Sequence, residues 1–141
     1  DSDRAKSLKA VKLHQVKLPH KTLVTIAKGC PYLQELQVSF MSCVDDRFLK
    51  QVAANCSSLQ NINLNGCRWV TDKGICELAR HCPLREIRLR GTQVTDHCVY
   101  VLAQCCPDLE WISHADYSGK PKFSEKALLA LKTSCVQRVI C

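Results

Sequence analysis

The stretch CSSLQNINLNGCRWVTDKGICELARHC, residues 56–82, contains the pattern that decides the fold. In its first half, Ile62 and Leu64 alternate with polar residues, which is typical of a short strand with one buried side. In its second half, apolar residues recur at helical intervals. These are Ile75, Leu78, Ala79 and Cys82. The stretch therefore predicts one strand followed by one helix with a single buried face.

The same pattern recurs along the chain as an internal repeat. Cysteines mark the end of each unit, at intervals of roughly 24 to 29 residues, a length found in solenoid proteins. They are Cys30, Cys56, Cys82, Cys106 and Cys135. One strand and one helix cannot bury their apolar faces alone, so neighbouring units must stack. We therefore predict an α/β solenoid with parallel strands on the concave face and helices on the convex face.

The repeat frame divides residues 1–141 into the units of one domain. The predicted units are 7–30, 31–56, 57–82, 83–106 and 107–135, and residues 136–141 begin another strand. Helix starts require a side-chain oxygen that accepts backbone N–H groups. Thr71 or Asp72, and correspondingly Thr95 or Asp96, stand at this position, and Ser124 takes it in the last unit. A stack cut between units would expose apolar ends, so we expect capping companions or self-association.

Composition limits the classes of function. Of the 141 residues, 46% are hydrophobic and the formal net charge is +7, but the basic residues are scattered. A dedicated nucleic-acid site is therefore not expected, and the apolar runs are too short to span a membrane.

The eleven cysteines do not form a recognisable chemical motif. Most occupy repeat positions, which favours small buried side chains over a disulfide framework. No C-x-x-C pair is present, and no cysteine stands apart with a histidine and a third orienting residue. We predict no metal, no cofactor and no enzymatic activity.

Residues 56–82 closely resemble the signature of cysteine-containing leucine-rich repeats, best known from F-box and leucine-rich-repeat proteins. The resemblance implies a hook that holds a protein substrate of an SCF-type ubiquitin ligase. In that family an F-box binds the Skp adaptor and cullin, and no F-box is visible in residues 1–141. The implied location is the cytoplasm or nucleus. A mitochondrial coupling factor of ATP synthase carries similar repeats without an F-box, so a mitochondrial coupling or assembly subunit is the alternative.

Outward strand residues and the residues just past the strands are the candidate partner contacts, because they would line the concave face. They are Glu35, Gln37, Asn61, Asn63, Asn65, Trp69, Glu86, Arg88, Arg90, Trp111, Ser113 and Tyr117. Arg and Trp are frequent interface anchors, although water-facing strand positions are polar in any protein. Phe40, Arg68 and Trp69 would either anchor a partner or pack under an adjacent loop.

The last full unit departs from the repeat. His114 takes the third apolar position of its strand, and Tyr117 replaces the loop cysteine. An insertion lengthens the loop 117–122, which carries Gly119 and Pro121. Such a loop either contacts a partner or reflects tolerance to insertion.

Overall fold

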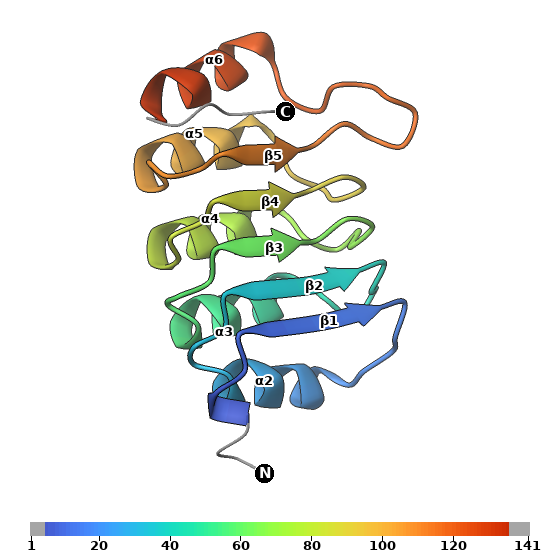
Figure 1. Cartoon of the computed structure of the whole chain (residues 1–141). Helices are drawn as coiled ribbons and strands as arrows, with labels where there is room; N and C mark the ends of the chain where they lie inside the picture. Colours follow the sequence, from blue (N-terminus) through green and yellow to red (C-terminus); the bar gives the residue numbers. More distant parts are fainter. Residues whose placement is uncertain (1–4, 136–141) are drawn as a thin grey trace.

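The computed structural model describes residues 5–135, which form a stack of strand–helix units (Figure 1). Its strands make one five-stranded parallel sheet in the order β1-β2-β3-β4-β5. The strands are β1 (Ala10–His14), β2 (Glu35–Ser39), β3 (Asn61–Asn63), β4 (Glu86–Arg88) and β5 (Trp111–Ser113). The helices are α2 (His20–Gly29), α3 (Asp46–Asn55), α4 (Asp72–His81), α5 (Asp96–Cys105) and α6 (Glu125–Ser134). The α/β repeat solenoid predicted from the sequence is confirmed.

Each predicted unit from 7–30 to 107–135 contains one strand and one helix, and residues 136–141 lie outside the described residues. Helices pack on neighbouring helices and strands pair with neighbouring strands, so each unit contacts the units before and after it. The sheet therefore forms one layer and the helices the other (Figure 1). No helix in residues 5–135 is long and apolar enough to cross a membrane.

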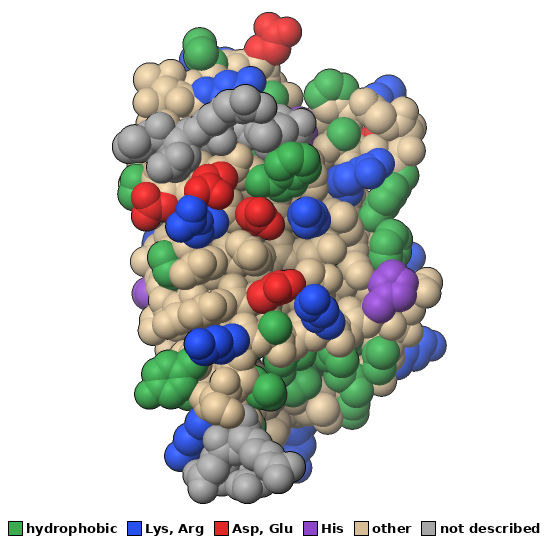
Figure 2. All heavy atoms as spheres, viewed as in Figure 1, with side chains coloured by type: hydrophobic (Ala, Val, Ile, Leu, Met, Phe, Trp, Pro, Cys, Tyr) green, Lys and Arg blue, Asp and Glu red, His purple; other side chains and the backbone are tan. Residues whose placement is uncertain are grey.

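The core is a set of apolar columns between the sheet and the helices. Inward strand residues such as Leu36, Ile62 and Ile87 are buried, and so are helix residues such as Leu49 and Leu78. The apolar columns end at the N-terminal side of the stack, where Leu8 and Val16 are exposed. Figure 2 shows hydrophobic side chains gathered beneath β1 on that side.

The repeat cysteines are buried as predicted, and they also donate hydrogen bonds. The Sγ of Cys56 donates to the Cys30 carbonyl at 3.4 Å, and the Sγ of Cys82 donates to the Cys56 carbonyl at 3.4 Å. Cys135 repeats this bond with the Cys106 carbonyl at 3.5 Å. A thiol at the end of each of the helices α3 to α6 thus donates to a carbonyl of the unit before it.

The sequence left open whether the threonine or the aspartate caps each helix, and the structure answers this for α4 and α5. Thr71 and Thr95 are the N-caps of α4 and α5, and Ser124 is the N-cap of α6. The aspartate that follows each threonine faces the next unit: the Asp72 carboxylate accepts a hydrogen bond from the Thr95 backbone N–H at 2.8 Å. Threonine therefore caps its own helix, and aspartate links its unit to the next.

Candidate protein-binding face

The outward side chains of the sheet form columns that run along the stack. Strand pairing aligns the first column, which consists of Ala10, Glu35, Asn61, Glu86 and Trp111. It also aligns the second column, which consists of Lys12, Gln37, Asn63, Arg88 and Ser113. A third column, nearer the strand ends, holds His14 and Ser39, whose side chains are 2.8 Å apart, and then Asn65 and Arg90.

Charge is graded across these columns. The acidic residues Glu35 and Glu86 lie in the first column, whereas Lys12 and Arg88 lie in the second and Arg90 in the third. Figure 2 shows acidic and basic side chains as neighbours on this face, with hydrophobic side chains beyond them. The face therefore changes from acidic to basic in the direction from the strand starts to the strand ends.

Only part of the basic charge on this face is neutralised. Lys12 lies 3.7 Å from a Glu35 carboxylate oxygen, and the Gln37 amide donates to the same carboxylate at 2.8 Å. Arg88 and Arg90, by contrast, form no ion pair with any carboxylate in residues 5–135. The C-terminal end of the face thus holds two arginines without an acidic partner among the described residues, and of these Arg90 also donates to the Ala115 and Asp116 carbonyls.

Both arginines lie against aromatic rings. The Arg88 guanidinium carbon is 5.9 Å from the centroid of the Trp111 ring, and that of Arg90 is 4.8 Å from the centroid of the Tyr117 ring. These are cation–π distances, and the contact fixes the position of each guanidinium without using its N–H donors. The sequence grouped Arg88, Arg90 and Trp111 as contacts, and the structure brings them together.

A hollow of about 310 Å³ lies at this end of the face. It is lined by Arg90, Trp111, Ser113, His114, Ala115 and Pro121. Trp111 Nε1, Ser113 Oγ and His114 Nδ1 are buried and have no hydrogen-bond partner among the described residues. Burial, and then the nearby Lys122 ammonium, lower the pKa of His114 below its ordinary value. Its imidazole is therefore neutral at pH 7. Such a concentration of unpaired polar atoms is unusual in a folded protein.

An exposed row of rings, which we call the aromatic ridge, borders the strand ends. It consists of His14, Phe40 and Tyr117, with ring centroids 5.6 Å apart for the first pair and 5.8 Å apart for the second. Phe40 is 44% exposed and Tyr117 is 52% exposed. Large, rigid aromatic groups held at the surface are typical of interface anchors.

Two glycines make the aromatic ridge possible. A Cβ atom on Gly66 would lie 2.3 Å from the Phe40 ring, and one on Gly91 would lie 2.7 Å from the Tyr117 ring. The two rings meet because they lie over the bare backbone of the two intervening units. Phe40 itself has a φ of 56°, in the left-handed region that bulky residues rarely adopt. Backbone strain of this kind is concentrated at functional sites.

The inserted loop is ordered by its own hydrogen bonds. Asp116 Oδ1 accepts from the Ser118 backbone N–H and the Lys120 backbone N–H, each at 2.9 Å. The Ser118 hydroxyl and these backbone groups hold the pKa of Asp116 below its usual value. Arg90 Nε donates to the Ala115 carbonyl at 3.3 Å, which holds the start of the loop against β4. The loop therefore presents Tyr117 in a defined position.

The other candidate contacts have different environments. Asn65 serves the stack, because its side-chain oxygen accepts from the Arg90 backbone N–H at 3.0 Å and its carbonyl accepts from the Phe40 N–H at 2.8 Å. Trp69 is 55% exposed, with the Arg68 guanidinium carbon 5.9 Å from its ring centroid. Asn61, Asn63 and Glu86 remain on the open face as predicted, and their contact with a partner stays a prediction.

The sequence did not identify two features of this face. The stacking of Phe40 on Tyr117 joins residues from units 31–56 and 107–135, and repeat spacing does not predict a contact at that range. The only signal in the sequence was a glycine just past two of the strands, Gly66 and Gly91. The corresponding positions of the two earlier units hold Gln15 and Phe40. The hollow beside His114 is likewise visible only in three dimensions.

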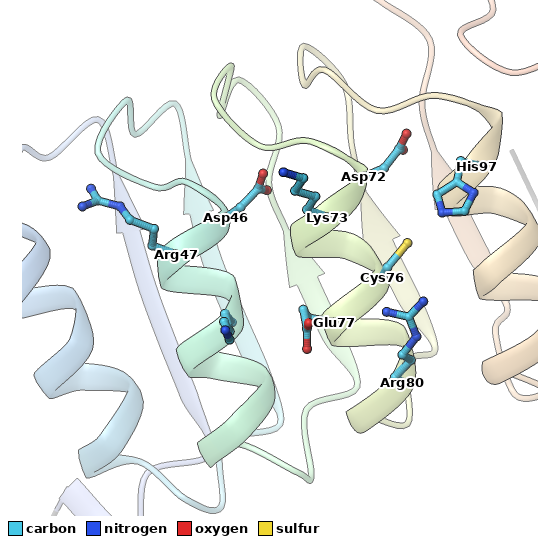
Figure 3. Close-up of a pocket in the computed structure, with 9 residues that line it drawn as sticks. Asp46, Arg47, Asp72, Lys73, Cys76, Glu77, Arg80 and His97 are labelled. Atoms are coloured by element: carbon cyan, nitrogen blue, oxygen red, sulfur yellow. The ribbon is translucent and has the colours of Figure 1, made fainter.

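A second groove, of about 430 Å³, lies on the helix side. It is lined by Asp46, Arg47, Lys50, Asp72, Lys73, Cys76, Glu77, Arg80 and His97 (Figure 3). Its aspartates are occupied by hydrogen bonds between units, and Arg47 pairs with Asp45 at 2.9 Å. Figure 3 shows Cys76 and Arg80 extending from α4 toward α5, where His97 lies. The groove follows from the spacing of neighbouring helices, and no phenylalanine, tyrosine or tryptophan lines it.

The buried cysteines are poorly suited to chemistry. Burial raises the pKa of the Cys56 thiol to about 11 and that of Cys82 to about 12, with smaller contributions from neighbouring thiols. Burial also raises the pKa of the Cys98 thiol. A protonated thiol is a poor nucleophile. Within residues 5–135, no cluster of three or more His, Cys, Asp or Glu side chains could hold a metal.

Comparison with known proteins places the chain among repeat proteins. No family model matches it. F-box/LRR-repeat protein 4 of Bos taurus is 30% identical over 109 residues, covering 73% of the chain and 18% of that protein. Antagonist of mitotic exit network protein 1 of Eremothecium gossypii is 32% identical over 129 residues, covering 84% of the chain and 33% of that protein. The chain thus spans a third or less of the length of these relatives.

Among solved structures, the tropomodulin C-terminal domain of Caenorhabditis elegans is similar to this chain with a TM-score of 0.56. It is 12% identical, and the match covers 86% of the chain and 81% of that domain, so the likeness concerns the fold alone. The stacked strand–helix units, together with the similarity to a protein that is named for its leucine-rich repeats, suggest a scaffold for protein interactions. The repeat fold and these similarities support a leucine-rich-repeat protein.

Proposed function

We propose that this chain is the substrate-recognition part of an SCF-type ubiquitin ligase and that its concave face binds the protein substrate. The observation that carries the proposal is the similarity to an F-box/LRR-repeat protein across 73% of the chain. The face supports it in kind, because Arg88, Arg90, Trp111 and Tyr117 are residue types that dominate the energy of protein interfaces. We propose the cytoplasm or nucleus as its location.

The ligase assignment predicts a particular set of companions. In this proposal the protein reaches the Skp adaptor and cullin through an F-box, and its repeats hold the substrate. Affinity capture of the native protein from cells that express it should recover an Skp-type adaptor and a cullin. The substrate should accumulate when cullin ligases are inhibited. Recovery of other partners without adaptor and cullin would reject the ligase assignment and leave an interaction scaffold.

The position of the site is tested with two matched variants. The combined Arg88→Ala, Arg90→Ala and Trp111→Ala variant should lose the substrate, because it removes both guanidiniums and the ring that holds one of them. A control with Arg47→Ala and Lys73→Ala removes the same number of positive charges, two, from the helix side and should retain the substrate. Equal capture by both variants would place the substrate elsewhere. Fluorescence microscopy of the tagged protein tests the location.

A further inference from the structure

The hollow at the end of β5 contains polar atoms that have no partner in the described part of the chain. His114 is only 7% exposed, yet its Nδ1 makes no hydrogen bond there. The same holds for Trp111 Nε1 and Ser113 Oγ, and all three residues line the hollow. Stacking does not require a polar residue here, because Leu89 takes the position of His114 in the unit before. A buried polar atom without a partner costs free energy, which a ligand that pairs with it would recover.

The unpaired atoms can all act as hydrogen-bond donors. The indole N–H of Trp111 can only donate, and the hydroxyl of Ser113 can donate as well as accept. A neutral imidazole carries its proton on either nitrogen, so Nδ1 of His114 can donate too. Trp111 and Ser113 are half-buried, so rotation of either side chain brings its polar atom to the surface of the hollow. The hollow therefore suits a chemical group that only accepts hydrogen bonds.

Positive charge surrounds the hollow. The Arg88 guanidinium carbon is 5.9 Å from the centroid of the Trp111 ring. Burial and then the Lys122 ammonium lower the pKa of His114, so this second cation also lies near the hollow. Neither cation forms an ion pair with a carboxylate in residues 5–135. Arg90 lines the hollow as well, but two of its nitrogens donate to loop carbonyls, so its contribution is charge. An anionic group would therefore be attracted to this place.

Glu110 and Asp116, which precede and follow β5, already have partners. Glu110 pairs with Arg85. Asp116 Oδ1 accepts from the backbone N–H groups of Ser118 and Lys120, each at 2.9 Å. Among the described residues, no aspartate or glutamate lines the hollow itself. The positive charge at the hollow is therefore not neutralised by this part of the chain.

We propose that this hollow is a carboxylate site, in which Trp111 and Ser113 donate to the oxygens and Arg88 balances the charge. A carboxylate only accepts hydrogen bonds and carries one negative charge, so it matches these groups. The volume of about 310 Å³ is at the low end for ligand pockets, so the hollow admits a single residue of a partner protein. Ala115 and Pro121 offer that residue apolar contact. The inference rests on the proposed function, because the carboxylate would belong to the protein that the concave face binds.

The test follows the indole N–H signals of the whole, isotope-labelled chain by proton–nitrogen nuclear magnetic resonance. The chain contains two tryptophans, so there are two such signals, and Trp111→Phe identifies one of them by its loss. A carboxylate that accepts from Trp111 should shift this signal downfield until the site is saturated. Trp69 does not line the hollow, so its signal should not move and serves as the internal reference.

Four short synthetic peptides distinguish the possible sources of the carboxylate. The first ends in leucine with a free carboxylate, and the second has the same sequence with a terminal amide. The third has the terminal amide and glutamate in place of leucine, and the fourth has phosphoserine at that position. We expect the first peptide, the third or both to bind, which assigns the carboxylate to a chain end, a side chain or either. The second should bind about tenfold more weakly or less, because it lacks the charge.

Two variants test the residues assigned to the site. Ser113→Ala should weaken binding of the carboxylate peptide about tenfold, as expected when a hydrogen bond to a charged group is lost. It should not lower stability, because the hydroxyl has no partner among the described residues. Arg88→Gln should weaken binding several-fold and make it less dependent on salt. Lys73→Gln removes the same charge from the helix side, and this control should bind as the original chain does.

Several results would overturn the proposal. Equal affinity for the two leucine peptides would mean that the hollow does not recognise the charge, and binding of the phosphoserine peptide alone would assign it to phosphate. If no peptide shifts the Trp111 signal, the hollow holds water only. If Trp69 shifts as much as Trp111, or if Ser113→Ala binds as tightly as the original chain, the peptides bind elsewhere. The capture of adaptor and cullin would still decide the proposed function separately.

Discussion

Asp46, at the start of α3, accepts hydrogen bonds from the Thr71 backbone N–H at 2.9 Å and from the Thr71 hydroxyl, one repeat further along the chain. It also accepts from the Gly74 backbone N–H at 3.1 Å. Asp72 makes the two corresponding bonds to Thr95, and Asp96 makes one, to the Ser124 backbone N–H at 2.9 Å. The same position in successive units therefore makes three, two and one bonds.

We predict that alanine substitutions at these aspartates destabilise the chain in that order. Asp46→Ala leaves two partly buried N–H groups without their acceptor and should cost about 2–3 kcal/mol. Asp96→Ala should cost about 1 kcal/mol, since one bond is lost. Urea unfolding followed by circular dichroism measures the difference. Equal losses at the three positions would mean that helix-end charge, which they share, outweighs the hydrogen bonds.

We predict that His114 makes stability depend on pH. Burial, and then Lys122, lower the pKa of His114 in the folded chain below its ordinary value of 6.5. As the pH falls below 6.5, the unfolded chain therefore binds a proton that the folded chain resists, and stability is lost. Above about pH 7 this contribution is constant.

The variant that tests this is His114→Leu, which restores the apolar residue found at Leu89 in the unit before. As the pH falls from about 7.5 to about 5, the original chain should lose stability that the variant keeps. The difference between their free energies of unfolding should therefore increase in favour of the variant. Urea midpoints measured across that range provide the comparison. If the two stability curves run parallel, the environment of His114 does not control the acid sensitivity.

We predict that thiol reactivity in the native chain follows exposure. Among the described cysteines, Cys105 is exposed and should react first with N-ethylmaleimide. Cys98 and Cys82 are buried with raised pKa values, and they should react only after unfolding. Mass spectrometry of peptides from native and urea-treated chain measures the order. Early modification of Cys98 would indicate that α5 opens locally.

The repeat frame could be predicted from the sequence because it is local. The spacing of Leu64, Ile75 and Cys82 specifies a strand, a helix and a stacking interval within one unit. The roles of Thr71 and Asp72 could not be separated, because both side chains can accept hydrogen bonds at a helix start. Only the position of the next unit shows that Asp72 binds across to Thr95.

The candidate site could be predicted only where it follows from the repeat pattern. Strand alternation places Arg88 and Trp111 on the open face, and their contact follows because β4 and β5 are neighbours. The stacking of Phe40 on Tyr117 depends on how the inserted loop folds back over two other units. A contact of that kind depends on loop conformation, which the repeat pattern does not determine.

The hydrogen bonds between aspartate and the next cap have a fixed direction along the chain. Asp46 precedes Thr71, and Asp72 precedes Thr95, so the acceptor always belongs to the unit that the ribosome makes first. The starts of α4, α5 and α6 therefore each depend on a carboxylate of the unit before them, so removing a unit would take an acceptor away from the unit that follows it in sequence.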